Sequence, residues 1–151
     1  MNEVHIEPAA SSPLAVVRRQ CSFQDFGKVI PDACGVVWNV IREEKVPGAG
    51  RHVALDLDDV CNLEVGVELQ APWAGHGEVF GSATPAGRVA TATHFGPYHQ
   101  LATSHQAIRQ WCVANGHALA GPSWELYGHW LHEWCDDPSK IRTDVYYLLK
   151  S

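Results

Sequence analysis

The spacing of apolar residues predicts four extended segments in the first half of the chain. Pro8 and Pro13 bracket the connection between the first two, which favours a hairpin. Asp56, Asp58 and Asp59 mark the turn between the last two. The predicted strands cover residues 4–7, 14–20, 52–57 and 63–69.

A helix is expected between these two pairs of strands. Ser22 with Asp25 resembles a helix start, and Pro31 suits a first helical position. The run 47–50 (PGAG) ends the unit. Apolar residues recur with helical spacing at Val36, Val37, Val40 and Ile41.

The second half repeats this order of elements. Residues 79–82 and 88–95 flank a turn and predict a second hairpin, and Gly96-Pro97 opens a helix that Gly116 ends. Leu101, His105, Ile108 and Cys112 share one face of that helix. The remaining elements are a turn at Gly121-Pro122, a strand at 124–130, a turn at 136–139 and a strand at 144–149.

The repeated order indicates an internal duplication. Val4 and Val79, Val36 and Trp111, and Pro47 and Pro122 are each 75 residues apart. We therefore expect a single α+β domain over residues 1–151, with pseudo-symmetric βαββ halves at about 1–75 and 76–151. The helices should cover one side of an antiparallel sheet, with a ligand groove where the halves meet.

Composition narrows the possible functions. A formal net charge of −6 argues against direct nucleic-acid binding. The five cysteines include no CxxC pair, and the nine histidines form no HExxH motif, so we expect reduced thiols, no metal and no cofactor. No signal peptide and no apolar run of about 18 residues is present, which favours a cytoplasmic protein without a membrane span. The sequence is compatible with a homo-oligomer.

The most informative segment is the predicted strand around Glu125. Alternation puts a carboxylate, a phenol and an imidazole on one face and apolar residues on the other. Glu125 is then either a solvated strand residue or the floor of a pocket, where aromatic walls would suit a cation and burial would suit general base chemistry. The first face carries Ser123, Glu125, Tyr127 and His129, and the core face carries Trp124, Leu126, Gly128 and Trp130.

Tryptophans and tyrosines supply the other candidate pocket residues. Trp73 lies in a Pro- and Gly-rich connection and is a candidate wall or lid, whereas Trp38 and Trp111 on the helices suit the core better. Tyr146 and Tyr147 point to opposite faces of the last strand, so one of them should face the pocket. The candidate ligand-binding residues are Trp38, Trp73, Trp124, Glu125, Tyr127, His129, Trp130, Tyr146 and Tyr147.

Three stretches resemble the GyrI-like small-molecule-binding (effector-binding) domains. They are residues 87–98 (GRVATATHFGPY), 115–127 (NGHALAGPSWELY) and 137–147 (DPSKIRTDVYY). The resemblance implies two βαββ repeats of the SHS2 type with a pocket between them. It also implies that Glu125 is the pocket acid, as in multidrug-sensing transcription regulators that bind cationic aromatic compounds.

The resemblance leaves three functions open. The first is binding of small aromatic, cationic or hydrophobic ligands, which demands only a pocket with an acid and aromatics. The second is hydrolysis of cyclopropanoid DNA-alkylating toxins, with Glu125 as general base and Tyr127, Tyr146 or His129 as donor to the oxyanion. The third is a protein-interaction role such as gyrase inhibition, for which the sequence has no long acidic run.

Overall fold

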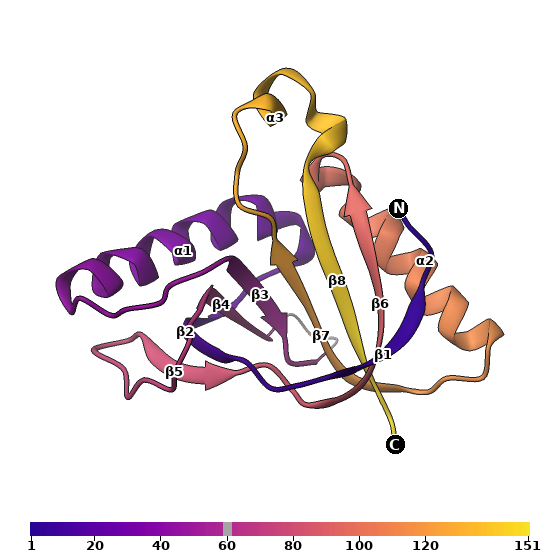
Figure 1. The fold of residues 1–151 in the computed structure, drawn as a ribbon, viewed down its shortest axis with the longest axis horizontal. Helices are drawn as coiled ribbons and strands as arrows, with labels where there is room; N and C mark the ends of the chain where they lie inside the picture. The colour runs from indigo at the N-terminus through magenta and orange to yellow at the C-terminus, as the bar shows by residue number, and fades with distance from the viewer. Residues whose placement is uncertain (59–61) are drawn as a thin grey trace.

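A single antiparallel sheet of eight strands forms the frame of the molecule (Figure 1). The computed structural model describes residues 1–58 and 62–151, so Asp59 of the predicted turn and Cys61 lie outside the described residues. The strands are β1 (His5–Ala9), β2 (Pro13–Gln20), β3 (His52–Asp56), β4 (Asn62–Glu68), β5 (Phe80–Ala83), β6 (Gly87–Phe95), β7 (Leu119–Tyr127) and β8 (Arg142–Leu149).

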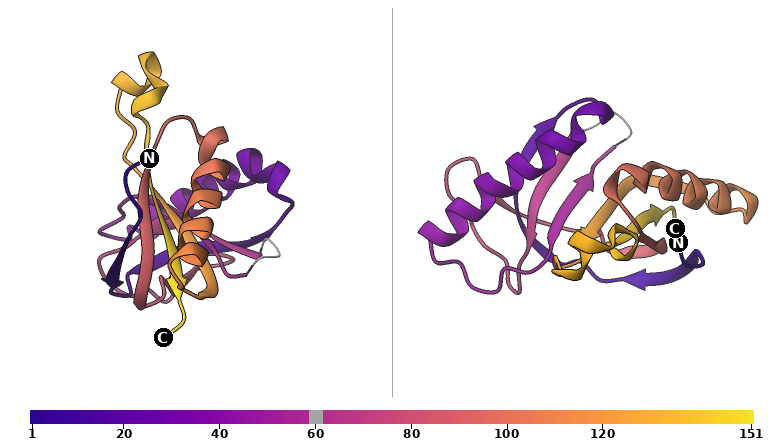
Figure 2. Two further views of the ribbon diagram at one scale, coloured as in Figure 1. Left: turned by 90° about the vertical axis from the view of Figure 1, so that its right-hand side faces the viewer. Right: turned by 90° about the horizontal axis from the view of Figure 1, so that it is seen from above.

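Two long helices cover the same face of this sheet, which confirms the predicted α+β class (Figure 2). They are α1 (Phe26–Glu43) and α2 (Leu101–Ala114), and a short helix α3 (Glu133–Asp136) lies in the β7–β8 connection. Single 3-10 turns occur at Phe23–Asp25, Tyr98–Gln100 and Pro138–Lys140. Among the described residues, no helix is long and apolar enough to cross a membrane.

The strand order is β1-β6-β8-β7-β3-β4-β2-β5. If β1 is exchanged with β5, β2 with β6, β3 with β7 and β4 with β8, the same order is read from the opposite edge of the sheet. Two βαββ halves related by a pseudo-twofold axis would give this pattern. Such an axis would lie between β3 and β7, where Ala54 pairs with Glu125. The repeat boundary near residue 75 stays a prediction.

Both predicted hairpins are wrong. β1 pairs with β6 rather than β2, and β5 pairs with β2 rather than β6, so the first strand of each half lies at the outer edge of the other half. The two connections that carry the chain across meet each other, since the Ser12 amide donates to Thr84 Oγ1 at 2.9 Å and the Thr84 amide donates to the Ser12 carbonyl at 3.0 Å. Alternation identifies a strand but does not choose its partner, because any edge with the right register satisfies the same backbone groups.

Two local predictions also need correction. Pro31 lies inside α1 rather than at its first position, and the helix continues because its apolar face, including Val37 and Ile41, is buried against the sheet. The Gly121-Pro122 pair lies within β7 rather than in a turn, at a register shift between Leu119 and Ser123. The same strand ends at Tyr127, three residues earlier than predicted.

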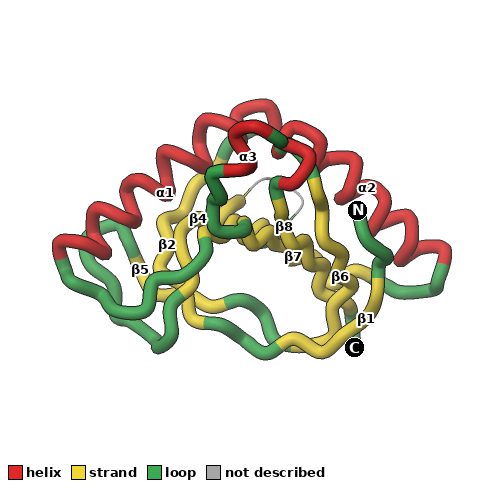
Figure 3. The backbone as a smooth tube through the Cα atoms, turned by 45° about the horizontal axis from the view of Figure 1, so that its top comes forward, coloured by secondary structure: helices red, strands yellow, loops and turns green. Residues whose placement is uncertain are grey.

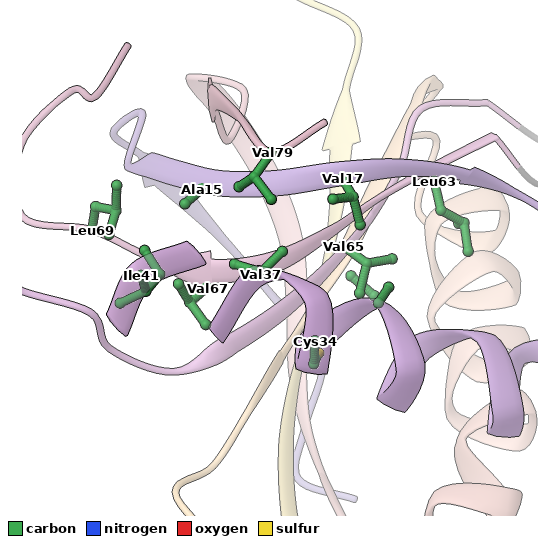
Figure 4. Close-up of a cluster of buried hydrophobic side chains, with 12 residues drawn as sticks. Ala15, Val17, Cys34, Val37, Ile41, Leu63, Val65, Val67, Leu69 and Val79 are labelled. Atoms are coloured by element: carbon green, nitrogen blue, oxygen red, sulfur yellow. The ribbon is translucent and has the colours of Figure 1, made fainter. Parts of the chain in front are cut away.

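Apolar side chains pack against both faces of the sheet, and the two long helices lie over one of these faces (Figure 3). One apolar cluster fills the space under α1 (Figure 4), and a smaller one around Ile108 and Val145 lies under α2. A third cluster occupies the opposite face and includes Leu14, Leu55 and Trp124. Because both faces are buried, β2 and β3 contain short continuous apolar runs (LAVV and VAL) rather than strict alternations.

Candidate functional site

A cleft of about 300 Å³ lies on the helix-covered face, at the junction of the two halves. The central strands β3 and β7 form its floor, and α2 supplies most of the helical wall, with the first residue of α1 opposite. Its lining residues are Phe26, Ala54, Asp56, Leu63, Ala102, His105, Arg109, Ser123, Trp124, Glu125 and Tyr147.

Glu125 lies on the floor of this cleft. Its strand neighbours are Ala54 on β3 and Val145 on β8, which offer no polar partner and, at Ala54, little bulk. The side chain is 12% exposed, and its Oε2 has no hydrogen-bond partner among the described residues. His105 Nε2 is 3.7 Å from that oxygen, which is ion-pairing distance if the imidazole is protonated. A largely buried carboxylate oxygen without a partner is available to a ligand or a water.

Tyr147 connects the carboxylate to the helix wall. Its hydroxyl is 2.6 Å from His105 Nδ1 and accepts a hydrogen bond from Arg109 Nη1 at 2.8 Å. Burial raises the pKa of Tyr147 to about 12, although the Arg109 guanidinium acts in the opposite direction. The phenol therefore keeps its proton at neutral pH. Because His105 and Arg109 are four residues apart on α2, both reach the same hydroxyl.

Tyr127 continues the polar face of β7 beyond Glu125. Burial raises its pKa well above the usual value, and the charge of Glu125 adds to the effect. Its ring meets that of Tyr98 edge-on, with centroids 5.6 Å apart. Tyr98 follows the β6–α2 junction, where Gly96 adopts a positive φ of 136° and buried His94 holds the turn by donating from Nε2 to the Pro97 carbonyl at 3.2 Å. Its own pKa is raised by burial and then by Glu125.

The two faces of β7 and β8 are used differently. The rings of Trp124 and Tyr146 stack at 5.3 Å on the face opposite Glu125, in the third apolar cluster, so Trp124 borders the cleft without presenting its ring to it. Of the two tyrosines, Tyr147 faces the cleft and Tyr146 does not. Tyr146 is thus placed away from Glu125, contrary to its expected role beside the base.

Other sequence candidates lie outside the cleft. Trp73 packs against the cluster under α1, and Trp38 does the same while donating from Nε1 to His52 Nε2 at 2.5 Å. His129 and Trp130 follow the end of β7 and are exposed, and the Trp130 ring meets Trp134 edge-on at 5.4 Å.

Sequence reasoning did not select His105 and Arg109 as site residues. His105 was recognised only as part of the inner face of α2, where a histidine among Leu101, Ile108 and Cys112 is an unusual polar residue. Arg109 follows it one turn later and is exposed, so its i, i+4 spacing from His105 is the signal that links it to the site.

The residues gathered here suit binding and proton chemistry. A carboxylate, an imidazole, two buried phenols and a guanidinium can pair with a cation, donate to an oxyanion or accept a proton. Within the described residues, no group of three or more His, Cys, Asp or Glu side chains could hold a metal ion. The described cysteines are free, and burial raises the pKa values of Cys34 and Cys112, which makes both poor nucleophiles.

Comparison with known proteins gives one family match. A family model described as the GyrI-like small molecule binding domain matches residues 2–150. No curated protein matches the chain.

Several solved structures share the fold. The C-terminal domain of EcmrR has a TM-score of 0.78 at 20% identity, covering 99% of this chain and 98% of that one, while this chain spans 57% of EcmrR in its complex with DNA. A protein solved with tetraphenylphosphonium bound has a TM-score of 0.68 at 11% identity, with 99% and 95% covered. A hydrolase from Listeria innocua has a TM-score of 0.65 at 9% identity, with 98% and 92% covered.

Proposed function

Because this chain belongs to the GyrI-like family of small-molecule-binding domains, we propose that it binds small aromatic cations in the cleft, with Glu125 as the charge partner. The observation that carries the proposal is the Glu125 carboxylate, which is 12% exposed and has an Oε2 without a hydrogen-bond partner among the described residues. A carboxylate with an unpartnered buried oxygen has lost part of its hydration, and a ligand cation would replace that lost interaction.

The surroundings of Glu125 suit an aromatic ligand. Tyr147 supplies ring surface at the lining, and Phe26, Ala54 and Leu63 supply apolar wall. Tyr127 and Tyr98 lie outside the lining, but the charge of Glu125 acts on both phenols. The cleft volume of about 300 Å³ is at the lower end of the range typical of small-molecule sites. Flat or globular aromatic cations gain both charge pairing and ring contact in such a place.

Calorimetric titration with tetraphenylphosphonium and with neutral triphenylphosphine oxide tests the proposal. The cation should bind at least about tenfold more tightly, because only it pairs with Glu125. Equal affinities for the two compounds, or no binding of either, would contradict it.

A second candidate function is hydrolysis of conjugated cyclopropanes, in which Glu125 acts as general base. The unpartnered Oε2 would accept a proton from water, and the water oxygen would attack the ring carbon. The breaking carbon–carbon bond would send its electron pair to the dienone oxygen, which would take a proton from a donor in the cleft. Tyr147, rather than Tyr146, is the proposed donor of this proton, because Tyr147 lines the cleft and its hydroxyl accepts a hydrogen bond from Arg109.

Mass spectrometry of a duocarmycin-type cyclopropanoid separates the two functions. Hydrolysis predicts the gain of one water in the presence of the protein, and loss of that gain in Glu125→Gln. An intact compound that nevertheless binds in the calorimeter would leave sequestration or sensing as the function.

A further inference from the structure

Arg109 places a guanidinium without a carboxylate partner at the lining of the cleft that also contains Glu125. The arginine–carboxylate pairs among the described residues are formed by Arg18, Arg19, Arg51 and Arg142. Arg109 instead donates to the neutral hydroxyl of Tyr147 at 2.8 Å, with its guanidinium carbon 6.0 Å from the centre of that ring. Its positive charge therefore has no anionic partner within the described part of the chain.

The position of Arg109 fixes how a ligand would meet it. Arg109 is an exposed residue at the lining of the cleft, where its guanidinium donates to the hydroxyl of buried Tyr147, while Glu125 lies on the floor. Arg109 lowers the pKa of Tyr147, whereas Glu125 and Asp56, which also line the cleft, raise it, so these charges lie near the same hydroxyl. A guanidinium with one of its five N–H groups engaged keeps a planar edge that suits a carboxylate or phosphate.

We propose that the cleft prefers aromatic zwitterions, in which a cationic group meets Glu125 and a carboxylate on the same ring system is held by Arg109. This inference rests on the proposed binding function and adds a second point of recognition to it. A ligand with only a cation leaves the guanidinium unmatched, whereas a zwitterion pairs both charges and carries no net charge into the cleft.

A matched pair of dyes tests this preference. A rhodamine with a free benzoate carboxylate and its methyl ester share the same cationic aromatic system and differ only in the negative charge. Near neutral pH, the wild-type protein should bind the free acid roughly tenfold more tightly than the ester, as expected for one charge-assisted hydrogen-bonded pair.

Arg109→Gln should bring the ratio of acid to ester affinity close to one, because only the acid loses a charge partner. Arg109→Lys should keep part of the preference, because the charge remains but the planar fork is lost. The control is Arg88→Gln, which removes the same charge from the exposed start of β6, outside the cleft, and should leave the ratio of affinities as in the wild type. Circular dichroism and thermal unfolding establish that each variant is folded.

Equal wild-type affinity for acid and ester would overturn the inference, and so would a preference that survives in folded Arg109→Gln. If Arg109→Gln fails to fold, the wild-type ratio and Arg109→Lys still decide the matter. Tetraphenylphosphonium and the ester do not need Arg109, so their failure to bind would instead overturn the proposed function, and this inference with it.

Discussion

Two largely buried glutamates lie on opposite faces of the sheet and have very different surroundings. Glu64, on β4, accepts a hydrogen bond from Arg18 Nη2 at 2.6 Å and another from the Ser82 hydroxyl. Glu125, on β7, has an oxygen with no hydrogen-bond partner among the described residues and a histidine nitrogen at 3.7 Å. The protein supplies a hydrogen bond to each oxygen of Glu64, whereas Oε2 of Glu125 has none among the described residues and is available to a ligand.

The contrast explains why burial alone does not identify a functional acid. A buried charge that is paired and hydrogen-bonded belongs to the structure, whereas one that is incompletely paired costs folding free energy and is retained where a ligand completes it. The two helices also contribute differently to the cleft wall. Phe26 of α1 is apolar, whereas His105 and Arg109 of α2 are basic.

The comparison is tested most strongly by Glu125→Gln. Affinity for tetraphenylphosphonium should fall about 10- to 100-fold, because a charge partner is lost from a poorly solvated site. The free energy of unfolding should stay the same or rise, since a carboxylate with an unpaired oxygen is removed. Calorimetry and urea unfolding measure the two quantities, and unchanged affinity would remove Glu125 from the site.

Glu64→Gln should behave in the opposite way. Its unfolding free energy should fall by about 1–2 kcal/mol, a modest loss because Arg18 is largely exposed and its ion pair is screened. Ligand affinity should be unaffected, because Glu64 lies on the far face. A loss of affinity equal to that of Glu125→Gln would erase the distinction between the two carboxylates.

Alkaline pH should report on the buried phenol of the cleft. Since burial raises the pKa of Tyr147 from 10.0 to about 12, its contribution to stability is complete below about pH 10 and is lost as the pH rises toward 12. At about pH 11 the loss amounts to about 1 kcal/mol. Urea unfolding at several alkaline pH values should therefore show a shallower decline for Tyr147→Phe than for the wild type; parallel declines would contradict this.

The smallest effect is expected at Tyr146, on the other face of the same strand. Tyr146→Leu should lower the unfolding free energy by about 0.5–1 kcal/mol through loss of stacking on Trp124. Binding of tetraphenylphosphonium should be unchanged. A clear loss of binding would mean that the far face participates in the site.

Strand β7 illustrates how far the sequence could reach. Alternation correctly placed Glu125 and Tyr127 opposite Trp124 and Leu126, because the side-chain period of a strand is a local property. The prediction extended the strand to residue 130, but β7 ends at Tyr127, so His129 lies beyond the strand and not on its polar face. The Gly121-Pro122 pair reads locally as a turn, yet pairing with β8 at a register shift keeps it in the strand.

The sequence by itself determined the order of strands and helices, the amphipathic face of each helix and the opposite orientation of Tyr146 and Tyr147. Each of these follows from the periodicity of a few consecutive residues. Only the tertiary structure decided that β1 crosses to β6 and β5 to β2, that Trp73 packs under α1, and that His105 and Arg109 meet Tyr147 beside Glu125. These depend on contacts between residues far apart in the chain, where many pairings satisfy the local pattern and packing of the whole sheet selects one.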